Sequence, residues 1–308
     1  MLIESTNSWR RAAHDKRIFI GGGILMFMFF LCIATLPWTL RSHSNFYYDN
    51  EHVDVPRTPP TTQAAWRLIG TSSLGQSLLG QCLVGGLISL TIGLAAAVIS
   101  VVLGVGVGLV AGYRGGWIDH LLMRTVDIMY SLPYVLLVVL LKLALEPPLK
   151  NVLPSEVANL TVLFLAIGLV SWQSMARVIR GQVLSLRAQP FIEAARAAGV
   201  PQTRIFLRHL LPNLIGPITV YATLTVPYAI LQESFLSFLG IGIQKPLPTW
   251  GSLASDGMGL ALVPPPATSC WWLLVFPCTL LAVTLLALNF VGDGLRDAFD
   301  PKSGKAKI

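Results

Sequence analysis

Long hydrophobic runs separated by short polar segments dominate this chain. A helix must present about 20 consecutive apolar residues to cross the hydrocarbon core of a bilayer. Six runs are long enough, and they predict an all-α integral membrane protein with six transmembrane helices. The predicted spans are residues 18–40, 86–110 (the core of the uncharged run 68–113), 123–145, 157–176, 214–239 and 271–290.

Composition agrees with this interpretation. Of the 308 residues, 54% are hydrophobic and 12% are charged, whereas soluble domains carry about a quarter charged residues. Run 18–40 is too long for a signal peptide and lacks a small-residue cleavage site, so we expect a retained anchor. The predicted divisions are a cytoplasmic N-terminal segment (1–17), the first anchor (18–40), an external loop (41–80), a five-helix core (81–292) containing the polar loop 177–213, and a cytoplasmic tail (293–308).

The distribution of basic residues predicts the orientation. With both termini cytoplasmic, the internal segments hold 16 of the 22 Lys and Arg residues, as the positive-inside rule requires. These are Arg10, Arg11, Lys16, Arg17, Arg114, Arg124, Arg177, Arg180, Arg187, Arg196, Arg204, Arg208, Arg296, Lys302, Lys305 and Lys307. Topology and contact with membrane lipid therefore explain the net charge of +7, and we expect no nucleic-acid partner.

The basic loop 177–213 contains the pattern of a short exposed helix. Pro190 suits the first helical position, Glu193 falls in the first turn, where the helix dipole favours an anion, and Gly199 is a natural stop. Pro201 prevents a smooth continuation. A small helix between two membrane spans, with a smooth face of alanines, predicts a docking element rather than a catalytic site.

The same loop carries a family resemblance. Glu193-Ala194-Ala195, followed by Gly199 and Leu211-Pro212, resembles the cytoplasmic EAA loop of the membrane subunits of ABC importers. The string RHLLPN is similar to the dipeptide/oligopeptide/nickel branch of that family. Three further segments agree with this branch: AGYRGGWIDHLLMRTVDIMYSLP (111–133), ESFLSFLGIGIQKPLPTWG (233–251) and NFVGDGLRDAFDP (289–301). Together they cover roughly residues 68–301.

The resemblance implies a function and a set of partners. It implies a permease in the bacterial cytoplasmic (inner) membrane, working with a second homologous permease subunit, two ATP-binding ABC subunits and an external solute-binding protein. The cargo would be di- or oligopeptides, with nickel or another small solute as the alternative. The loop would couple the chain to the ATPases through Phe191, Ile192, Glu193, Ala194, Ala195, Ala198, Gly199, Leu211 and Pro212.

The chain departs from the family pattern at two places. The isoleucine that the pattern expects near the end of the loop falls at His209, with Leu210 beside it. Before the second span, a charged motif of the family is replaced by the uncharged GTSSLGQSLLGQ (70–81), in which Ser72, Gln76 and Ser77 stand where acids and arginine are usual. We expect the backbone turn to be kept without the ion pairs.

Motifs for nucleotide binding, metal binding and catalysis are missing from the sequence. No G-x-x-x-x-G-K-[ST] string occurs, and the nearest one, Ser303-Gly304-Lys305-Ala306, lacks the leading glycine and the hydroxyl. The histidines and acids of residues 43–54 lack regular spacing, so we expect no metal site. We therefore expect no cofactor and no enzymatic activity in this chain, with ATP hydrolysis on the partner subunits.

Acidic residues at membrane depth require a reason, because a charged aspartate there costs about 2.5–3.5 kcal/mol. We predict a structural ion pair between Arg124 and Asp127, which are one helical turn apart. Glu233 lies deeper and matches a glutamate of the family pattern. It is a candidate for lining the translocation path, with an interhelical hydrogen bond as the alternative role.

Close helix packing is the prediction for the glycines of the second span. Gly104, Gly108 and Gly112 are spaced four residues apart, which lets two helices approach closely in lipid.

Two other functions remain open at the level of the sequence. A secondary transporter should carry inverted repeats and ion-binding acids in broken helices, and neither is visible. A non-transporting membrane scaffold would use the same loop to recruit a cytoplasmic protein.

Overall fold

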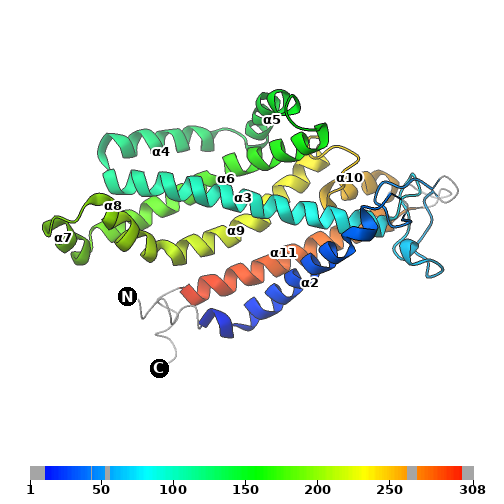
Figure 1. Ribbon diagram of the computed structural model, residues 1–308, viewed down its shortest axis with the longest axis horizontal. Helices are drawn as coiled ribbons and strands as arrows, with labels where there is room; N and C mark the ends of the chain where they lie inside the picture. Colours follow the sequence, from blue (N-terminus) through cyan, green and yellow to red (C-terminus); the bar gives the residue numbers. More distant parts are fainter. Residues whose placement is uncertain (1–10, 43, 53–55, 262–268, 300–308) are drawn as a thin grey trace.

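The computed structural model describes residues 11–42, 44–52, 56–261 and 269–299. Within these ranges the chain is a bundle of long helices (Figure 1), and the only β-pairing in the described part is an isolated bridge between Thr71 and Ser77. The prediction of an all-α membrane fold is confirmed. Parts of the predicted segments 1–17, 43–54 and 293–308, including the string at 303–306, lie outside the described residues.

Five predicted spans correspond to helices long and apolar enough to cross a membrane. The last of the loop helices, α8 (Gln202–Ile205), continues through a π-helical turn, η2 (Phe206–Leu210), into the fourth of these five helices. The five are α2 (Lys16–Thr39), α3 (Leu78–Arg114), α6 (Ser155–Arg187), α9 (Leu211–Phe238) and α11 (Trp272–Phe299).

The third predicted span is not one straight helix. The chain forms α4 (Gly116–Ser131) and α5 (Tyr134–Lys150), which meet at a bend of 102°. Leu132 is extended there (φ −85°, ψ 140°), because the proline that follows it disfavours the helical conformation. The prediction of a continuous span over 123–145 is therefore wrong, and the bent pair takes its place as the sixth apolar segment.

The glycines of α3 allow α6 to approach closely, as predicted. A Cβ atom added at Gly104 would lie 2.5 Å from the Cβ of Met175, and one at Gly108 would lie 2.8 Å from the Cβ of Ile179. Gly112 meets Val183, one turn further along α6, in the same way. Backbone-to-side-chain packing of this kind is what small residues provide between helices in lipid.

The bundle has two distinct ends (Figure 1). The α7 end carries the short helix α7 (Pro190–Ala197), the start of α2 and the end of α11. The α10 end carries α10 (Trp250–Ala261), the 3₁₀ turn η1 (Ala65–Arg67) and the segment between α2 and α3.

Ion pairs join α2 to α11 at the α7 end. Arg17 of α2 contacts Asp297 of α11 at 2.6 Å and Asp15, the N-cap of α2, at 3.2 Å. Partial burial acts to raise the pKa of Asp15, but its hydrogen bonds from Arg17 hold that pKa below the usual value.

The uncharged GTSSLGQS segment forms a hydrogen-bonded turn at the α10 end. Gly75 has a positive φ of 78°, and the Ser72 backbone N–H donates to the Gln76 carbonyl at 2.9 Å. The side chain of Gln76 donates to Asp49 at 3.1 Å, and the hydroxyl of Ser77 donates to the Trp66 carbonyl at 2.7 Å. Hydrogen bonds, rather than ion pairs, therefore hold this turn.

Candidate functional site

The loop between α6 and α9 begins with the helix that the sequence predicts. Helix α7 spans Pro190–Ala197, with the proline at its first position and Glu193 in its first turn. Gly199 ends it with φ +72°, a left-handed conformation that favours glycine. The backbone N–H of Val200 returns to the Ala195 carbonyl at 3.1 Å, so the helix terminates in a compact turn before α8.

Helix α7 has a buried side and an exposed side. Ile192 is fully buried, and Phe191 and Ala195 pack partly buried against the same cluster, which includes Ile205 and Leu210. The exposed side, called here the exposed α7 face, consists of Glu193, Ala194, Arg196, Ala197, Ala198 and Gly199.

Part of the predicted coupling set packs against the interior: Ile192 is fully buried, and Phe191, Ala195 and Leu211 are partly buried against the same cluster. Ala195 does not share the exposed surface of Ala194 and Ala198, which corrects the single smooth face expected from the sequence. Leu211 packs against the same interior cluster, whereas Pro212 is exposed. The residues that a partner can reach are therefore fewer than the sequence pattern includes.

The π-helical turn η2 accounts for the substitution at His209. Leu210 is fully buried in the cluster beneath α7, whereas His209 is only partly buried. A π-turn contains one residue more than an α-helical turn, which shifts the inward-facing position along the chain. Leu210 therefore supplies the apolar side chain that the family pattern expects one residue earlier.

Helix α7 is tied to the end of α3 through Tyr113. The guanidinium of Arg187, the last residue of α6, donates to the Tyr113 carbonyl at 3.1 Å and to the Gly112 carbonyl at 3.3 Å. Cations are favoured at a helix C-terminus because the last carbonyls lack partners. The guanidinium of Arg196, from α7, lies 5.0 Å from the centre of the Tyr113 ring. The centres of the Tyr113 and Phe206 rings are 4.5 Å apart, and Phe206 belongs to η2.

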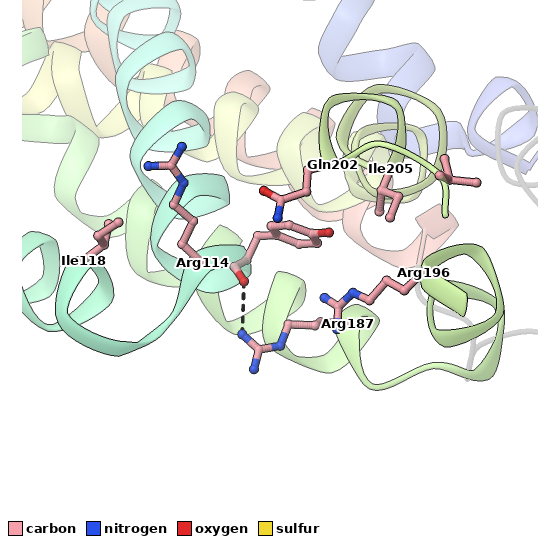
Figure 2. Close-up of a pocket in the computed structure, with 8 residues that line it drawn as sticks. Arg114, Ile118, Arg187, Arg196, Gln202 and Ile205 are labelled. Carbon is pink, nitrogen blue, oxygen red and sulfur yellow. Dashed lines mark hydrogen bonds between the residues drawn. The ribbon is translucent and has the colours of Figure 1, made fainter. Parts of the chain in front are cut away.

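A basic groove of about 800 Å³ lies beside this junction. Arg114, Arg187 and Arg196 surround it, each from a different helix (Figure 2). The remaining lining residues are Tyr113, Ile118, Val200, Gln202 and Ile205. A partner surface that enters this groove must offer negative charge or hydrogen-bond acceptors.

Asp127 is paired with a residue other than the predicted one. Its carboxylate accepts from Arg177 of α6 at 2.8 Å, so Arg177, not Arg124, is the ion-pair partner of Asp127. A second pair, between Asp119 of α4 and Arg180 of α6, has both carboxylate oxygens engaged, one of them at 2.6 Å. The sequence reasoning missed this pair because its members are 61 positions apart.

Glu233 lies in the interior of the chain. It is fully buried, and its Oε1 accepts from Ser237 at 2.6 Å and from Thr249 at 2.8 Å. Thr249 immediately precedes α10, so the carboxyl joins α9 to the α10 end. This environment supports the alternative role, a hydrogen bond between elements, and lining of the translocation path stays a prediction.

Comparison with known proteins identifies the family of the chain. Residues 104–305 match the family model described as "Binding-protein-dependent transport system inner membrane component". The chain belongs to this family. It is therefore a permease, the membrane-spanning component of a binding-protein-dependent transport system in the inner membrane.

Several relatives cover nearly the whole permease. It is 39% identical over 307 residues to the oligopeptide transport system permease protein OppC of Haemophilus influenzae, with 98% of this chain and 91% of the relative aligned. It is 41% identical over 303 residues to OppC of Escherichia coli K12, covering 97% and 93%. The dipeptide transport system permease protein DppC of Bacillus subtilis is 38% identical over 301 residues, covering 98% and 87%.

A solved structure shares the fold of the permease. A chain of the MetNI methionine ABC transporter, from a structure titled as inward facing, superposes with a TM-score of 0.56 over 70% of this chain and 94% of the other. The two chains are 17% identical, so this likeness concerns the fold alone.

Proposed function

We propose that this permease imports oligopeptides or dipeptides as one of two homologous permease subunits, driven by two ATP-binding subunits and supplied by an external solute-binding protein. The names of the relatives, with 38–41% identity over almost the full chain, support this cargo. The α7 end faces the cytoplasm, which places both termini inside, and residues 41–80 lie outside. This orientation agrees with the distribution of basic residues.

The exposed α7 face is the surface that receives the ATPase. The single observation that carries this assignment is the division of α7 into a buried side, anchored by Ile192, and an exposed side rich in alanine. Small side chains let a partner approach the backbone closely, and the anchored side transmits the movement to the bundle. Arg187 and Arg196 connect α7 to the end of α3 through Tyr113, so a displacement of α7 is communicated to a membrane-spanning helix.

Two substitutions test the coupling role. Ala198→Trp adds bulk to the exposed α7 face, and Gly199→Val introduces a branched side chain at φ +72°, where no other heavy atom lies within 4 Å of an added Cβ. We expect each to lower peptide uptake roughly tenfold, the effect of losing a typical coupling free energy between sites. Membrane insertion of the variants should be unchanged.

The matched control is Ala13→Trp, which adds the same bulk to an exposed alanine at the α7 end but outside the loop. Uptake of labelled tripeptides and peptide-stimulated ATP hydrolysis are measured on the reconstituted complex. Normal uptake by both loop variants would refute the coupling role. A wild-type complex whose ATP hydrolysis does not respond to peptide would instead favour a scaffold.

A further inference from the structure

A second cavity, open to the surface of the bundle, lies at the bend between α4 and α5. Its volume is about 360 Å³, and α6 and α9 complete its walls. Ser171 lies at the middle of α6, and Leu224 and Thr225 lie at the middle of α9. The lining residues are Met129, Tyr130, Leu132, Tyr134, Leu137, Val170, Ser171, Gln173, Ser174, Tyr221, Leu224, Thr225 and Tyr228. All of these residues fall within the predicted spans 123–145, 157–176 and 214–239, so the cavity is at membrane depth.

The tyrosines of this cavity are unusual for a surface that contacts lipid tails. Tyr130 is 54% exposed, Tyr228 is 47% exposed and Tyr221 is 39% exposed. Tyrosine is enriched at the two interfaces of a membrane, where its hydroxyl reaches water or headgroups. A tyrosine hydroxyl facing hydrocarbon at the middle of a span would lose its hydrogen bonds. This face must therefore meet water, a polar ligand or a protein surface.

Two buried donors of the lining also lack partners. Neither the Tyr134 hydroxyl nor the side-chain nitrogen of Gln173 has a hydrogen-bond partner among the described residues. By contrast, the hydroxyls of Ser171 and Thr225 donate to carbonyls of their own helices, at 2.7 and 2.8 Å. The free donors are thus supplied by tyrosine and glutamine, and a buried donor without a partner costs about 1–3 kcal/mol.

The lining offers hydrogen bonds without charge. None of its residues is Asp, Glu, Lys or Arg. Beside the lining residue Tyr130, the guanidinium of Arg177 lies 4.2 Å from the centre of the ring and is paired with Asp127. A ligand in the cavity therefore meets hydroxyl and amide donors and flat aromatic faces, and no fixed charge selects among its side chains.

We propose that this cavity is the part of the cargo passage contributed by this subunit, and that Tyr134 and Gln173 donate hydrogen bonds to the backbone carbonyls of a passing peptide. The assignment rests on the proposed peptide cargo and adds the residues that meet it. Backbone carbonyls are common to all peptides, and uncharged walls accept acidic and basic side chains alike. The same passage can then serve peptides of different sequence.

The first test removes the donors one at a time. Tyr134→Phe and Gln173→Leu are compared in reconstituted complexes that import Ala-Ala-Ala, Ala-Lys-Ala and Ala-Glu-Ala. We expect the maximal uptake rate of all three peptides to fall about three- to tenfold, the change expected for one lost hydrogen bond. Thr161→Val, which removes a hydroxyl bonded within α6, and Gln63→Leu, in the segment between α2 and α3, are the controls and should transport as the wild type does.

The second test adds a charge to the wall of the cavity. A general loss of stability would lower the uptake of all peptides without changing the ratio between them, so a changed ratio is specific. Gln173→Glu should favour Ala-Lys-Ala over Ala-Glu-Ala by roughly tenfold relative to the wild type, because opposite charges a few ångströms apart attract strongly in such a site. Loss of uptake for all peptides without a change in their ratio would overturn the proposal. An unchanged ratio with normal uptake would overturn it as well.

Photo-crosslinking identifies what occupies the cavity. The reactive analogue p-benzoylphenylalanine is placed at Tyr221 and, as a control, at Phe27, which is 65% exposed on α2. During turnover with radiolabelled Ala-Ala-Ala, we expect a peptide adduct at position 221 and none at position 27. An adduct at 221 with the second permease alone, or with lipid alone, would assign the cavity to that occupant and overturn the proposal. A wild-type complex that imports none of the three tripeptides would refute the proposed peptide cargo itself.

Discussion

The two ion pairs that connect α4 to α6 differ in how far their side chains are buried. Asp119 and Arg180 are 16% and 34% exposed, and both carboxylate oxygens of Asp119 are engaged. Asp127 and Arg177 are 57% and 42% exposed and share one contact at 2.8 Å. Hydrogen bonds to charged groups contribute more to the free energy of unfolding when they are shielded from water, and exposed ion pairs contribute little to it.

Removing the two arginines should therefore have unequal effects. We expect Arg180→Gln to lower the free energy of unfolding by about 1–3 kcal/mol, and Arg177→Gln to lower it by about 0–1 kcal/mol. Thermal unfolding of the purified permease in detergent measures both. The charge-swapped pair Asp119→Arg with Arg180→Asp should recover part of the loss, and equal effects of the two single substitutions would contradict this ranking.

The ion pairs illustrate a limit of prediction at the scale of single residues. The sequence identifies Asp127 as a residue that needs a cation, but the nearest one along the chain, Arg124, is not its partner. Arg177 is 50 positions away and becomes available only because α4 and α6 lie together in the folded bundle. Likewise, the local pattern places Ala195 with Ala194, whereas packing against Ile205 and Leu210 determines which side of α7 is exposed.

Helices α3 and α6 pack through a row of glycines, so we expect larger residues at these glycines to destabilise the bundle. Gly104→Ala places a methyl group 2.5 Å from the Cβ of Met175 and 2.8 Å from the Trp172 carbonyl. Overpacking of this kind costs about 1–3 kcal/mol. We expect Gly104→Ala to lower the unfolding temperature and Gly104→Val to lower it further.

Gly106 provides the matched control on the same helix, since a Cβ added there meets no heavy atom within 4 Å. Gly106→Ala should leave the unfolding temperature unchanged or raise it slightly, because alanine reduces the backbone freedom of the unfolded chain. If Gly104→Ala and Gly106→Ala behaved alike, the α3–α6 contact would be looser than the structure describes.

Hydropathy predicts the existence of most spans but not the path of the third. Five apolar runs became single long helices because a continuous apolar helix satisfies its own backbone inside a membrane. The run 123–145 also carries Arg124, Asp127 and Lys142, and Pro133 restricts Leu132 to an extended conformation where the chain turns. A window average cannot register one such residue. The sequence pattern therefore could not predict the cavity at this bend.

Helix α3 links the two ends of the molecule. Its N-cap, Ser77, is bonded to the Trp66 carbonyl within the α10 end, where the Trp250 ring nitrogen also donates to the Cys82 carbonyl at 2.9 Å. Its C-terminus is held by Arg187 beside α7. A single helix thus connects the α10 end, which lies outside in the proposed topology, with the surface proposed to face the ATPase.

The orientation of the whole molecule can be tested by the accessibility of introduced cysteines. Of the native cysteines, Cys32, Cys82 and Cys270 are buried, whereas Cys278 is exposed on α11. Cys278→Ser therefore provides the background. Single cysteines are introduced at the exposed positions Ala13 and Thr203, at the α7 end, and Gln63, in the segment between α2 and α3.

A membrane-impermeant maleimide should label Gln63→Cys in cells whose inner membrane is intact, because this position lies on the external side in the proposed topology. Ala13→Cys and Thr203→Cys should be labelled only after the inner membrane is permeabilised. The physical reason is the excess of basic residues at the α7 end, which is retained in the cytoplasm during insertion. Labelling of Thr203→Cys in intact cells would show that the topology is inverted, and the exposed α7 face could then not meet a cytoplasmic ATPase.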